Sequence, residues 1–229
     1  MLRHLLLAIC VGLGSTLTGF AADAYTVKEG KAAPPEGLKE AIAKVLGENS
    51  IQVSDAKGNL LAEIWLRKEV TAKATPEQIK NGLSYREVPE GTLMGVVRFP
   101  KNVTDYKKQT IKRGVYTLRL GVQPENGDHQ GTAPYPDFCL LVPADDDKDP
   151  APIIAKELQD RSDKASGSSH PAVFLLFPIP LKEVGDQAKM VDKGDGHWVL
   201  TSKVEVKVGD EKTDLGVGLT LIGVSSAAQ

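Results

Sequence analysis

The sequence has little of several features that would narrow its function directly. It contains two cysteines and no Cys-x-x-Cys pair, so it shows neither a dithiol redox motif nor a zinc-ribbon pattern. The Gly-x-Ser-x-Gly, His-Glu-x-x-His and phosphate-loop motifs are also absent, which removes the common signatures of hydrolases, metalloproteases and nucleotide-binding enzymes. The 28 basic and 30 acidic residues leave no basic excess, and we therefore expect no nucleic-acid partner.

Residues 1–24 have the organisation of a secretory signal peptide, with a basic start, an apolar run over 5–13 and small residues at the end. The pattern predicts cleavage before Tyr25, with a cut after Ala21 as the alternative. Removal of this segment takes away Cys10 and leaves a single cysteine, so we expect no internal disulfide. No later run is long enough to cross a bilayer. We predict export to the periplasm or the extracellular space, with no transmembrane segment after signal removal.

Alternation with a period of two residues dominates the rest of the chain, and this is the pattern of strands with one buried face. Residues 172–177 are instead apolar at every position, which predicts a central strand covered on both faces. Helical spacing of apolar residues occurs over 36–46 and 150–164, and a short helical turn is expected over 75–81. Predicted strands cover 51–53, 60–66, 93–99, 115–122, 138–142, 172–177, 197–208 and 215–221.

These patterns predict a mainly β fold, because strands and helices do not alternate along the chain. The expected architecture is an antiparallel β-sandwich, with a jelly roll as one form of it, and two or so peripheral helices. Residues 25–34 are polar and are predicted to form a flexible N-terminal arm. Residues 35–229 contain no long linker and are predicted to form one domain.

The loop over 123–137 is the best candidate for a site, because its Asn-Gly turn and its prolines favour a fixed conformation. Within it, Asp128, His129 and Asp137 are side chains able to bind a divalent metal or to carry out acid–base chemistry. The structural alternative is that both carboxylates bind loop amides and that His129 lies on the surface. The predicted ligand-binding residues are Asp128, His129, Asp137, Tyr135 and Arg119.

The remaining histidines of the mature chain offer a second possible metal site. His170 precedes the predicted central strand, and His197 follows a Gly-Asp-Gly turn. Together with His129 they would supply the three imidazoles of a zinc site. Their positions are far apart in the sequence, so the spacing itself does not require them to meet.

The acidic run over 145–149 suggests calcium, but it fails the helix–loop–helix template. That template requires glycine at its sixth position, where this chain has Pro150, and an acid at its twelfth, where it has Lys156. The simpler interpretation is a set of carboxylates at the N-terminus of the helix predicted over 150–164, where they favour the helix dipole.

Three short motifs surround the candidate loop. Residues 114–119 are Gly-Val-Tyr-Thr-Leu-Arg, residues 123–129 are Gln-Pro-Glu-Asn-Gly-Asp-His, and residues 137–141 are Asp-Phe-Cys-Leu-Leu. In this order they resemble a group of uncharacterised exported bacterial proteins. The Gly-x-Tyr-x-Leu part is also similar to a wider bacterial domain family of unknown function with β-sandwich character. The resemblance implies export and an all-β core, and it implies no activity.

The strand-rich pattern without a catalytic motif favours a monomeric, non-enzymatic module that binds a ligand or protein partner at the cell envelope. An alternative hypothesis is a metal-binding protein or metal-dependent hydrolase that uses a divalent metal held by Asp128, His129 and Asp137. A third hypothesis is a carbohydrate-binding module in which the ring of Trp65 or Tyr135 stacks on a sugar. For Trp65, packing against the helix predicted over 36–46 is the structural alternative.

Overall fold

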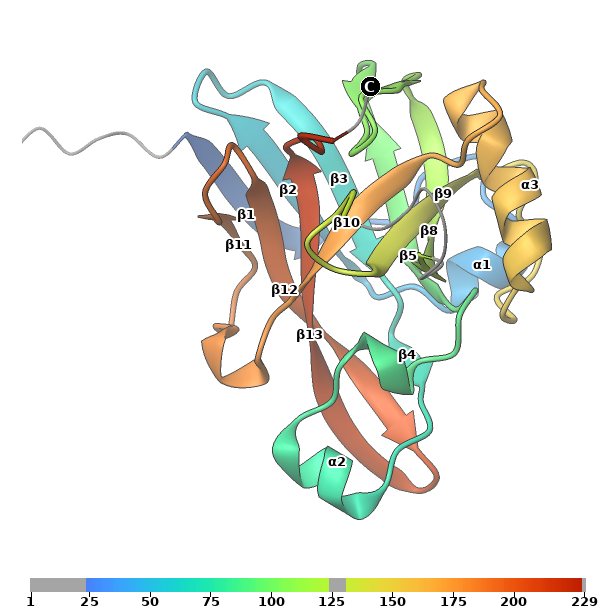
Figure 1. The fold of residues 1–229 in the computed structure, drawn as a ribbon, viewed down its shortest axis with the longest axis vertical. Helices are drawn as coiled ribbons and strands as arrows, with labels where there is room; N and C mark the ends of the chain where they lie inside the picture. The colour runs from blue at the N-terminus through green and yellow to red at the C-terminus, as the bar shows by residue number, and fades with distance from the viewer. Residues whose placement is uncertain (1–23, 124–130, 228–229) are drawn as a thin grey trace, which may run out of the picture.

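A computed structural model of the chain describes residues 24–123 and 131–227 (Figure 1). Strands make up 44% and helices 15% of the structure, so the protein is mainly β, as the two-residue alternation predicted. Most strands belong to one large, curled, antiparallel-rich sheet with a sandwich-like form. Residues 1–23, which hold nearly all of the predicted signal peptide, and residues 124–130 lie outside the described part of the chain.

The strands are β1 (Tyr25–Lys31), β2 (Asn49–Asp55), β3 (Leu60–Leu66), β4 (Glu69–Thr71), β5 (Leu93–Phe99), β6 (Val103–Thr104), β7 (Thr110–Ile111), β8 (Gly114–Val122), β9 (Asp137–Pro143), β10 (Val173–Pro178), β11 (Lys189–Asp192), β12 (Trp198–Val208) and β13 (Glu211–Ile222). The large sheet has the order β1-β2-β3-β5-β8-β9-β10-β13-β12-β11, and each strand is antiparallel to the next. β4 pairs in parallel with β12, while β6 and β7 form a separate ribbon.

The helices are α1 (Glu40–Lys44), α2 (Pro76–Asn81) and α3 (Ala155–Ser166), with short 3-10 turns at Tyr85–Glu87 and Leu181–Glu183. α2 confirms the predicted helical turn. A reciprocal capping box between Thr75 and Gln78 satisfies two of its free N-terminal amides. Within residues 24–123 and 131–227, every helix is too short or too polar to cross a membrane.

The inside of the curled sheet is a continuous apolar core. Alternate residues of each strand point into it, as the period-two pattern predicted. The space between β3, β5 and β8 on one side and β12 and β13 on the other is almost filled, because the cavity there has a volume of about 10 Å³. A void of this size holds at most one water molecule. The core includes Ile64, Leu118, Leu141, Phe174, Leu200 and Leu219.

Two smaller apolar clusters cover parts of the outer face of the sheet. α3 places Leu158 against Val173 and Leu175 of β10. α1 places Ile42 against Trp65 of β3. Because the other apolar side chains of β10 enter the internal core, this strand is covered on both faces. The uninterrupted apolar sequence of 172–177 predicted that position.

The first and last strands of the sheet, β1 and β11, meet at a seam. The rings of Tyr25 and Trp198 are in edge contact there, with their centroids 4.9 Å apart. Farther along, the amide of Ala188 donates a hydrogen bond to the carboxylate of Glu29. Among the described residues, β1 pairs with β2 alone and β11 with β12 alone. Side chains and the amide of Ala188 therefore close the seam, and no ladder of main-chain hydrogen bonds joins the two strands.

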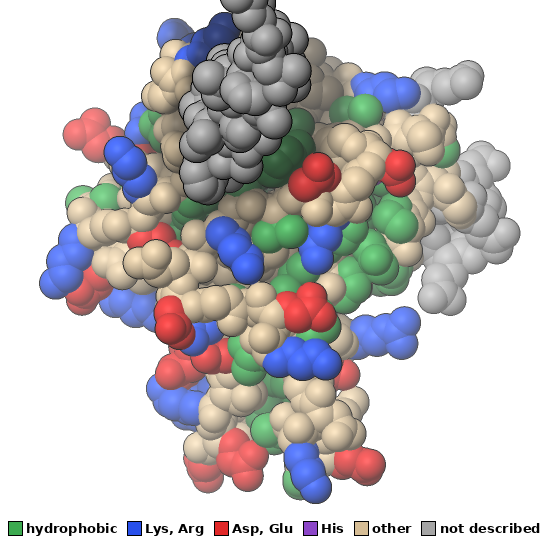
Figure 2. Space-filling model, turned by 90° about the vertical axis from the view of Figure 1, so that its left-hand side faces the viewer, with side chains coloured by type: hydrophobic (Ala, Val, Ile, Leu, Met, Phe, Trp, Pro, Cys, Tyr) green, Lys and Arg blue, Asp and Glu red, His purple; other side chains and the backbone are tan. Residues whose placement is uncertain are grey.

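The β12–β13 hairpin extends below the body of the molecule beside α2 (Figure 1). Its charged side chains form pairs of opposite sign, including Lys212 with Glu69 at 2.8 Å and with Glu205 at 2.7 Å. These carboxylates raise the pKa of Lys212. On the face shown in Figure 2, basic and acidic side chains are interspersed over the lower part of the molecule.

The N-terminal segment differs from the sequence prediction. Residues 25–34 were predicted to be a flexible arm, whereas residues 25–31 form β1 and pair with β2. Tyr25 and Val27 alternate with polar residues and pack against the internal core. A strand with only two apolar residues shows a weak two-residue alternation. Its stability comes from pairing with the neighbouring strand, which the sequence pattern does not reveal.

The helices predicted over 36–46 and 150–164 both begin later in the structure. α1 has only five residues, because Gly37 adopts a positive φ of 90° and the chain becomes helical only after Lys39. α3 begins at Ala155, so the acidic run over 145–149 does not lie at a helix N-terminus. The run instead belongs to a loop that is bound to the sheet.

Candidate functional site

The paired strands β8 and β9 carry the predicted site at one end and a surface cleft at the other. Val122 pairs with Asp137 at the first end, and Tyr116 pairs with Pro143 at the second. Six strand residues at about 3.3 Å each separate the two ends by about 20 Å. The polar loop and the cleft are therefore different places on the molecule.

At the loop end, the structure describes only part of the predicted site. Asp128 and His129 lie outside the described residues. Asp137 is 9% exposed and shares the inward face of β9 with Cys139, which belongs to the internal core. Burial raises the pKa of Asp137, and the positive charge of Arg86 partly opposes this shift. Asp137 is thus a buried carboxylate at the end of the core.

Tyr135 lies on the other side of the sheet, within an aromatic group. Its ring contacts Phe177 with centroids 5.0 Å apart, and Phe177 in turn lies 6.1 Å from the ring of His197. The Nε2 atom of His197 is buried and has no hydrogen-bond partner, whereas Nδ1 lies 3.2 Å from the carbonyl of Gly194. The structure therefore brings Tyr135 and His197 into one cluster and leaves Asp137 on the opposite face.

The other predicted metal ligands are not gathered in the part of the chain that the structure describes. His170 is exposed in the loop after α3. Across residues 24–123 and 131–227, no three histidine, cysteine, aspartate or glutamate side chains are close enough to hold a metal ion. The hypothesis that uses Asp128 and His129 stays a prediction, because those two residues lie outside these ranges.

Arg119 is completely buried, and its position is structural. A guanidinium has five N–H donors, and here every donor has a partner within the protein. Two of them form a bidentate pair with the carboxylate of Asp147, at 2.8 Å each. The others donate to the main-chain carbonyls of Gly91, Ala151 and Asp149. Arg119 retains no donor for a ligand, and we therefore leave it out of the candidate site.

Asp147 is the partner that the sequence did not reveal. It is also completely buried, and it accepts a hydrogen bond of 2.5 Å from the hydroxyl of Thr117. Thr117 and Arg119 stand on the same face of β8, opposite Leu118. A buried charge is stable only when it is paired and hydrogen-bonded. The loop over 144–154 is therefore held against β8 by this ion pair.

Main-chain contacts complete the attachment of that loop. The amide of Ala144 donates to Val115 of β8 at 3.1 Å, and the amide of Ile153 donates to Gly91 at 3.2 Å. Gly91 has a φ of 80°, and a Cβ atom there would lie 1.8 Å from the carbonyl oxygen of Ile153. Only glycine allows this close approach.

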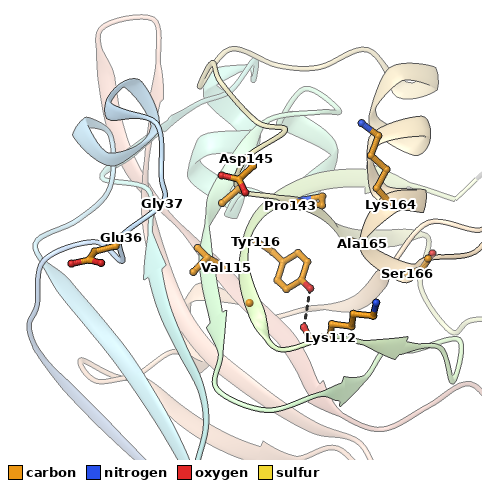
Figure 3. Close-up of a pocket in the computed structure, with 13 residues that line it drawn as sticks. Glu36, Gly37, Lys112, Val115, Tyr116, Pro143, Asp145, Lys164, Ala165 and Ser166 are labelled. Atoms are coloured by element: carbon orange, nitrogen blue, oxygen red, sulfur yellow. Dashed lines mark hydrogen bonds between the residues drawn. The ribbon is translucent and has the colours of Figure 1, made fainter.

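The cleft at the other end of β8 and β9 has a volume of about 370 Å³ (Figure 3). It lies between the segment before α1, the strand ends and the C-terminus of α3. Its floor contains the ring of Tyr116, which is 7% exposed, with Val115 and Pro143 beside it. The hydroxyl of Tyr116 donates to the carbonyl of Lys112 at 2.8 Å. Burial raises the pKa of Tyr116, so the floor is neutral.

The rim of the cleft carries charges of both signs. Glu36 and Asp145 supply two carboxylates, and Lys112 and Lys164 supply two ammonium groups. In Figure 3 both lysines lie on the α3 side of Tyr116, whereas Glu36 and Asp145 lie on the other side. Lys164 also forms an ion pair of 3.3 Å with Asp146. The cleft thus combines an apolar floor with separated positive and negative groups.

Ser166 is the hydroxyl residue at the end of the cleft, and its contacts do not activate it. Its Oγ atom lies 3.0 Å from the carbonyl of Asp163 and 2.6 Å from the carbonyl of His170. It therefore donates to main-chain oxygens. A nucleophilic serine would instead donate to the ring of a histidine.

Of the two rings proposed to stack on a sugar, that of Trp65 is buried. Trp65 is 2% exposed and packs against Ile42 and Leu46. Its indole N–H donates to the carbonyl of Ala32 at 3.1 Å. Packing against the helical segment, the structural alternative for this residue, is what the structure shows.

No sequence pattern predicted the cleft, although one of the motifs contains residues that line it. Gly114 and Tyr116 belong to the first motif, and Pro143 lies two residues after the third. The other lining residues come from distant segments with no shared pattern. Comparison of the chain with protein families, curated proteins and solved structures finds no match.

Proposed function

We propose that the protein is an exported module that binds a small ligand in the cleft between α3, β8, β9 and the segment before α1. The observation that carries this proposal is the combination of a neutral, apolar floor with charged groups on the rim. Ligand sites typically have a volume of about 300–1,000 Å³ and combine apolar walls with a few polar groups. The cleft, at about 370 Å³, has these properties.

The attachment of the 144–154 loop supports the proposal. Pro143, Ala144 and Asp145 form one wall of the cleft, and the buried pair of Arg119 and Asp147 fixes the chain directly after them. A wall that is ordered before the ligand arrives reduces the entropy lost on binding. The ion pair is therefore a positioning device, remote from the ligand itself.

Binding accounts for the cleft better than catalysis does. The hydroxyl groups nearest to the ligand space, those of Tyr116 and Ser166, already donate to main-chain carbonyls. Hydrolysis through a covalent intermediate would require a nucleophilic side chain with a base within hydrogen-bond distance. We therefore favour a binding module over a hydrolase.

A binding screen on the mature protein tests the proposal. A set of small metabolites and short peptides is added to ¹⁵N-labelled protein, and we expect shifts confined to the amides that line the cleft. Asp145→Trp places an indole at the cleft wall and should weaken binding by at least about tenfold. Lys148→Trp is the matched control, because Lys148 is exposed in the same loop and does not line the cleft. Equal binding by both variants would place the site elsewhere.

Export is tested separately. We expect the protein isolated from the envelope fraction of its host to begin at Tyr25, or at Ala22 if the alternative cut is used. A protein that retains Met1 in the cytoplasm would contradict this part of the proposal.

A further inference from the structure

We infer that the ligand of the cleft is a short peptide with both termini free, held by its ammonium group near Glu36 and Asp145 and by its carboxylate near Lys112 and Lys164. This inference rests on the proposed function of the cleft as a ligand site. It adds the chemical class of the ligand, which follows from the distribution of charge and of open space in the cleft.

The charges on the rim favour a ligand with two ends. Two carboxylates and two ammonium groups leave the rim without net charge. A simple anion or cation gains from one group of charges and is repelled by the other. A ligand with an ammonium group at one end and an anion at the other gains from both, provided that its length matches their separation.

Lys112 is the cation that defines the direction of binding. Lys164 already has Asp146 as a partner at 3.3 Å, so part of its charge is neutralised. In Figure 3 the ammonium group of Lys112 points toward the space between Tyr116 and Ser166. A carboxylate in this space would meet Lys112 first, and the opposite end of the ligand would extend toward Glu36.

The middle of the cleft matches the uncharged part of a peptide. Val115, Tyr116 and Pro143 form an apolar floor against which a small side chain can pack. Gly37 and Gly167 line opposite parts of the cleft, and a Cβ atom at either would meet no other atom within 4 Å. The open space at these two positions leaves room for the main chain of a peptide to pass close to the cleft wall.

Titration of the mature protein with four tripeptides tests the inference. The probes are Ala-Ala-Ala, its N-acetyl form, its C-terminal amide and the form blocked at both ends. We expect each single block to weaken binding by about two- to fivefold, the effect of losing one exposed ion pair. The doubly blocked form should show the weakest binding. Glycerophosphoethanolamine is the fifth probe, because it also carries an ammonium group and an anion.

Two variants that replace a charged side chain by a neutral one show which end of the peptide each residue binds. Lys112→Gln should weaken Ala-Ala-Ala but leave the affinity for its amide unchanged, because the lost partner is the carboxylate. Glu36→Gln should weaken Ala-Ala-Ala but leave the acetylated form unchanged. Lys148→Gln and Glu77→Gln are matched controls at exposed positions outside the cleft, and they should leave all affinities unchanged.

The outcomes separate the inference from the proposed function. Equal affinity for free and blocked peptides, tighter binding of glycerophosphoethanolamine, or no cleft shifts with any peptide overturns the peptide assignment. In each case the cleft remains a ligand site if another compound of the screen binds there and Asp145→Trp abolishes that binding. If no compound shifts the cleft amides, both the peptide assignment and the proposed function fail.

Discussion

The two ends of the β8–β9 pair differ in how they use polar residues. At the Asp137 end, a buried carboxylate and a group of aromatic rings close the structure. At the Tyr116 end, charged groups stay on the rim of an open cleft, and the buried charges, Arg119 and Asp147, lie behind its wall. The comparison shows that residues close together in sequence can lie on opposite faces of the sheet, as Tyr135 and Asp137 do. The cleft, in contrast, gathers its lining from segments that are far apart in the sequence.

The largest expected effect breaks the support of the cleft end. Arg119→Met leaves Asp147 as an unpaired buried charge, and we expect it to lower the free energy of unfolding by about 3–5 kcal/mol. Urea denaturation measures the loss. Replacing both residues, as Arg119→Met with Asp147→Leu, should recover part of the loss, because no buried charge remains unpaired while the three carbonyls and the Thr117 hydroxyl still lack their partners. A single variant as stable as the parent would contradict the structural role of the pair.

The floor of the cleft should be less sensitive. Tyr116→Phe removes the hydrogen bond to the carbonyl of Lys112 but keeps the ring, so we expect a loss of about 1 kcal/mol. Thermal denaturation measures the change. A loss as large as that of Arg119→Met would mean that the hydroxyl, rather than the ion pair, organises this end.

At the Asp137 end, replacing the carboxylate should stabilise the protein near neutral pH. Burial raises the pKa of Asp137, so the folded protein binds this proton more tightly than the unfolded chain does. Stability contributed by this group is therefore present at low pH and is lost as the pH rises from about 4 through the raised pKa. Asp137→Asn removes the buried charge that the parent carries at pH 7, so it should raise the free energy of unfolding at that pH.

The measurement is the difference in unfolding free energy between the parent and Asp137→Asn at pH 4 and pH 7. We expect the variant to gain only at the higher pH. Asp55→Asn is the opposite control, because hydrogen bonds from Asn59 lower the pKa of Asp55. Its stabilising contribution grows as the pH rises, so its replacement should cost stability at pH 7.

The smallest expected effect concerns metal at the loop end. We expect the purified mature protein to contain no stoichiometric zinc, copper or calcium, and added ions to leave its melting temperature unchanged. Metal analysis by mass spectrometry checks this. Near-stoichiometric metal that disappears in His129→Ala would assign the loop as a metal site and would favour the metal hypothesis over the cleft.

Sequence patterns predicted the eight long strands that have one side against a large core, whereas the strands of two to four residues, β4, β6, β7 and β11, were not predicted. The uninterrupted apolar run over 172–177 became a strand covered on both faces, and the strand over 93–99 ends before Pro100 as predicted. The edge strand β1 escaped prediction, since most of its side chains are exposed and its stability comes from pairing with β2. A two-residue alternation of apolar side chains arises where one face of a strand is buried. An exposed edge strand buries few side chains, so it shows little of this alternation.

The candidate site was harder to predict because its parts come from distant segments. Arg119 and Asp147 are 28 positions apart, and neither local charge nor spacing identifies them as partners. Arg119 does carry one clue, because it lies on a strand between apolar residues, where a charge requires a buried partner. The cleft itself has no such clue, because Glu36, Lys112 and Lys164 meet only through folding.

The seam between β1 and β11 has a mechanical consequence. No ladder of main-chain hydrogen bonds joins these strands, and the main-chain amide of Ala188 bonds only to a side chain across the seam. The sheet therefore has one direction in which it opens at low cost. Amide protons along β1 should therefore exchange with solvent faster than those of β10. The curled sheet is therefore not a closed cylinder, and its N-terminal strand β1 is the edge at which it opens.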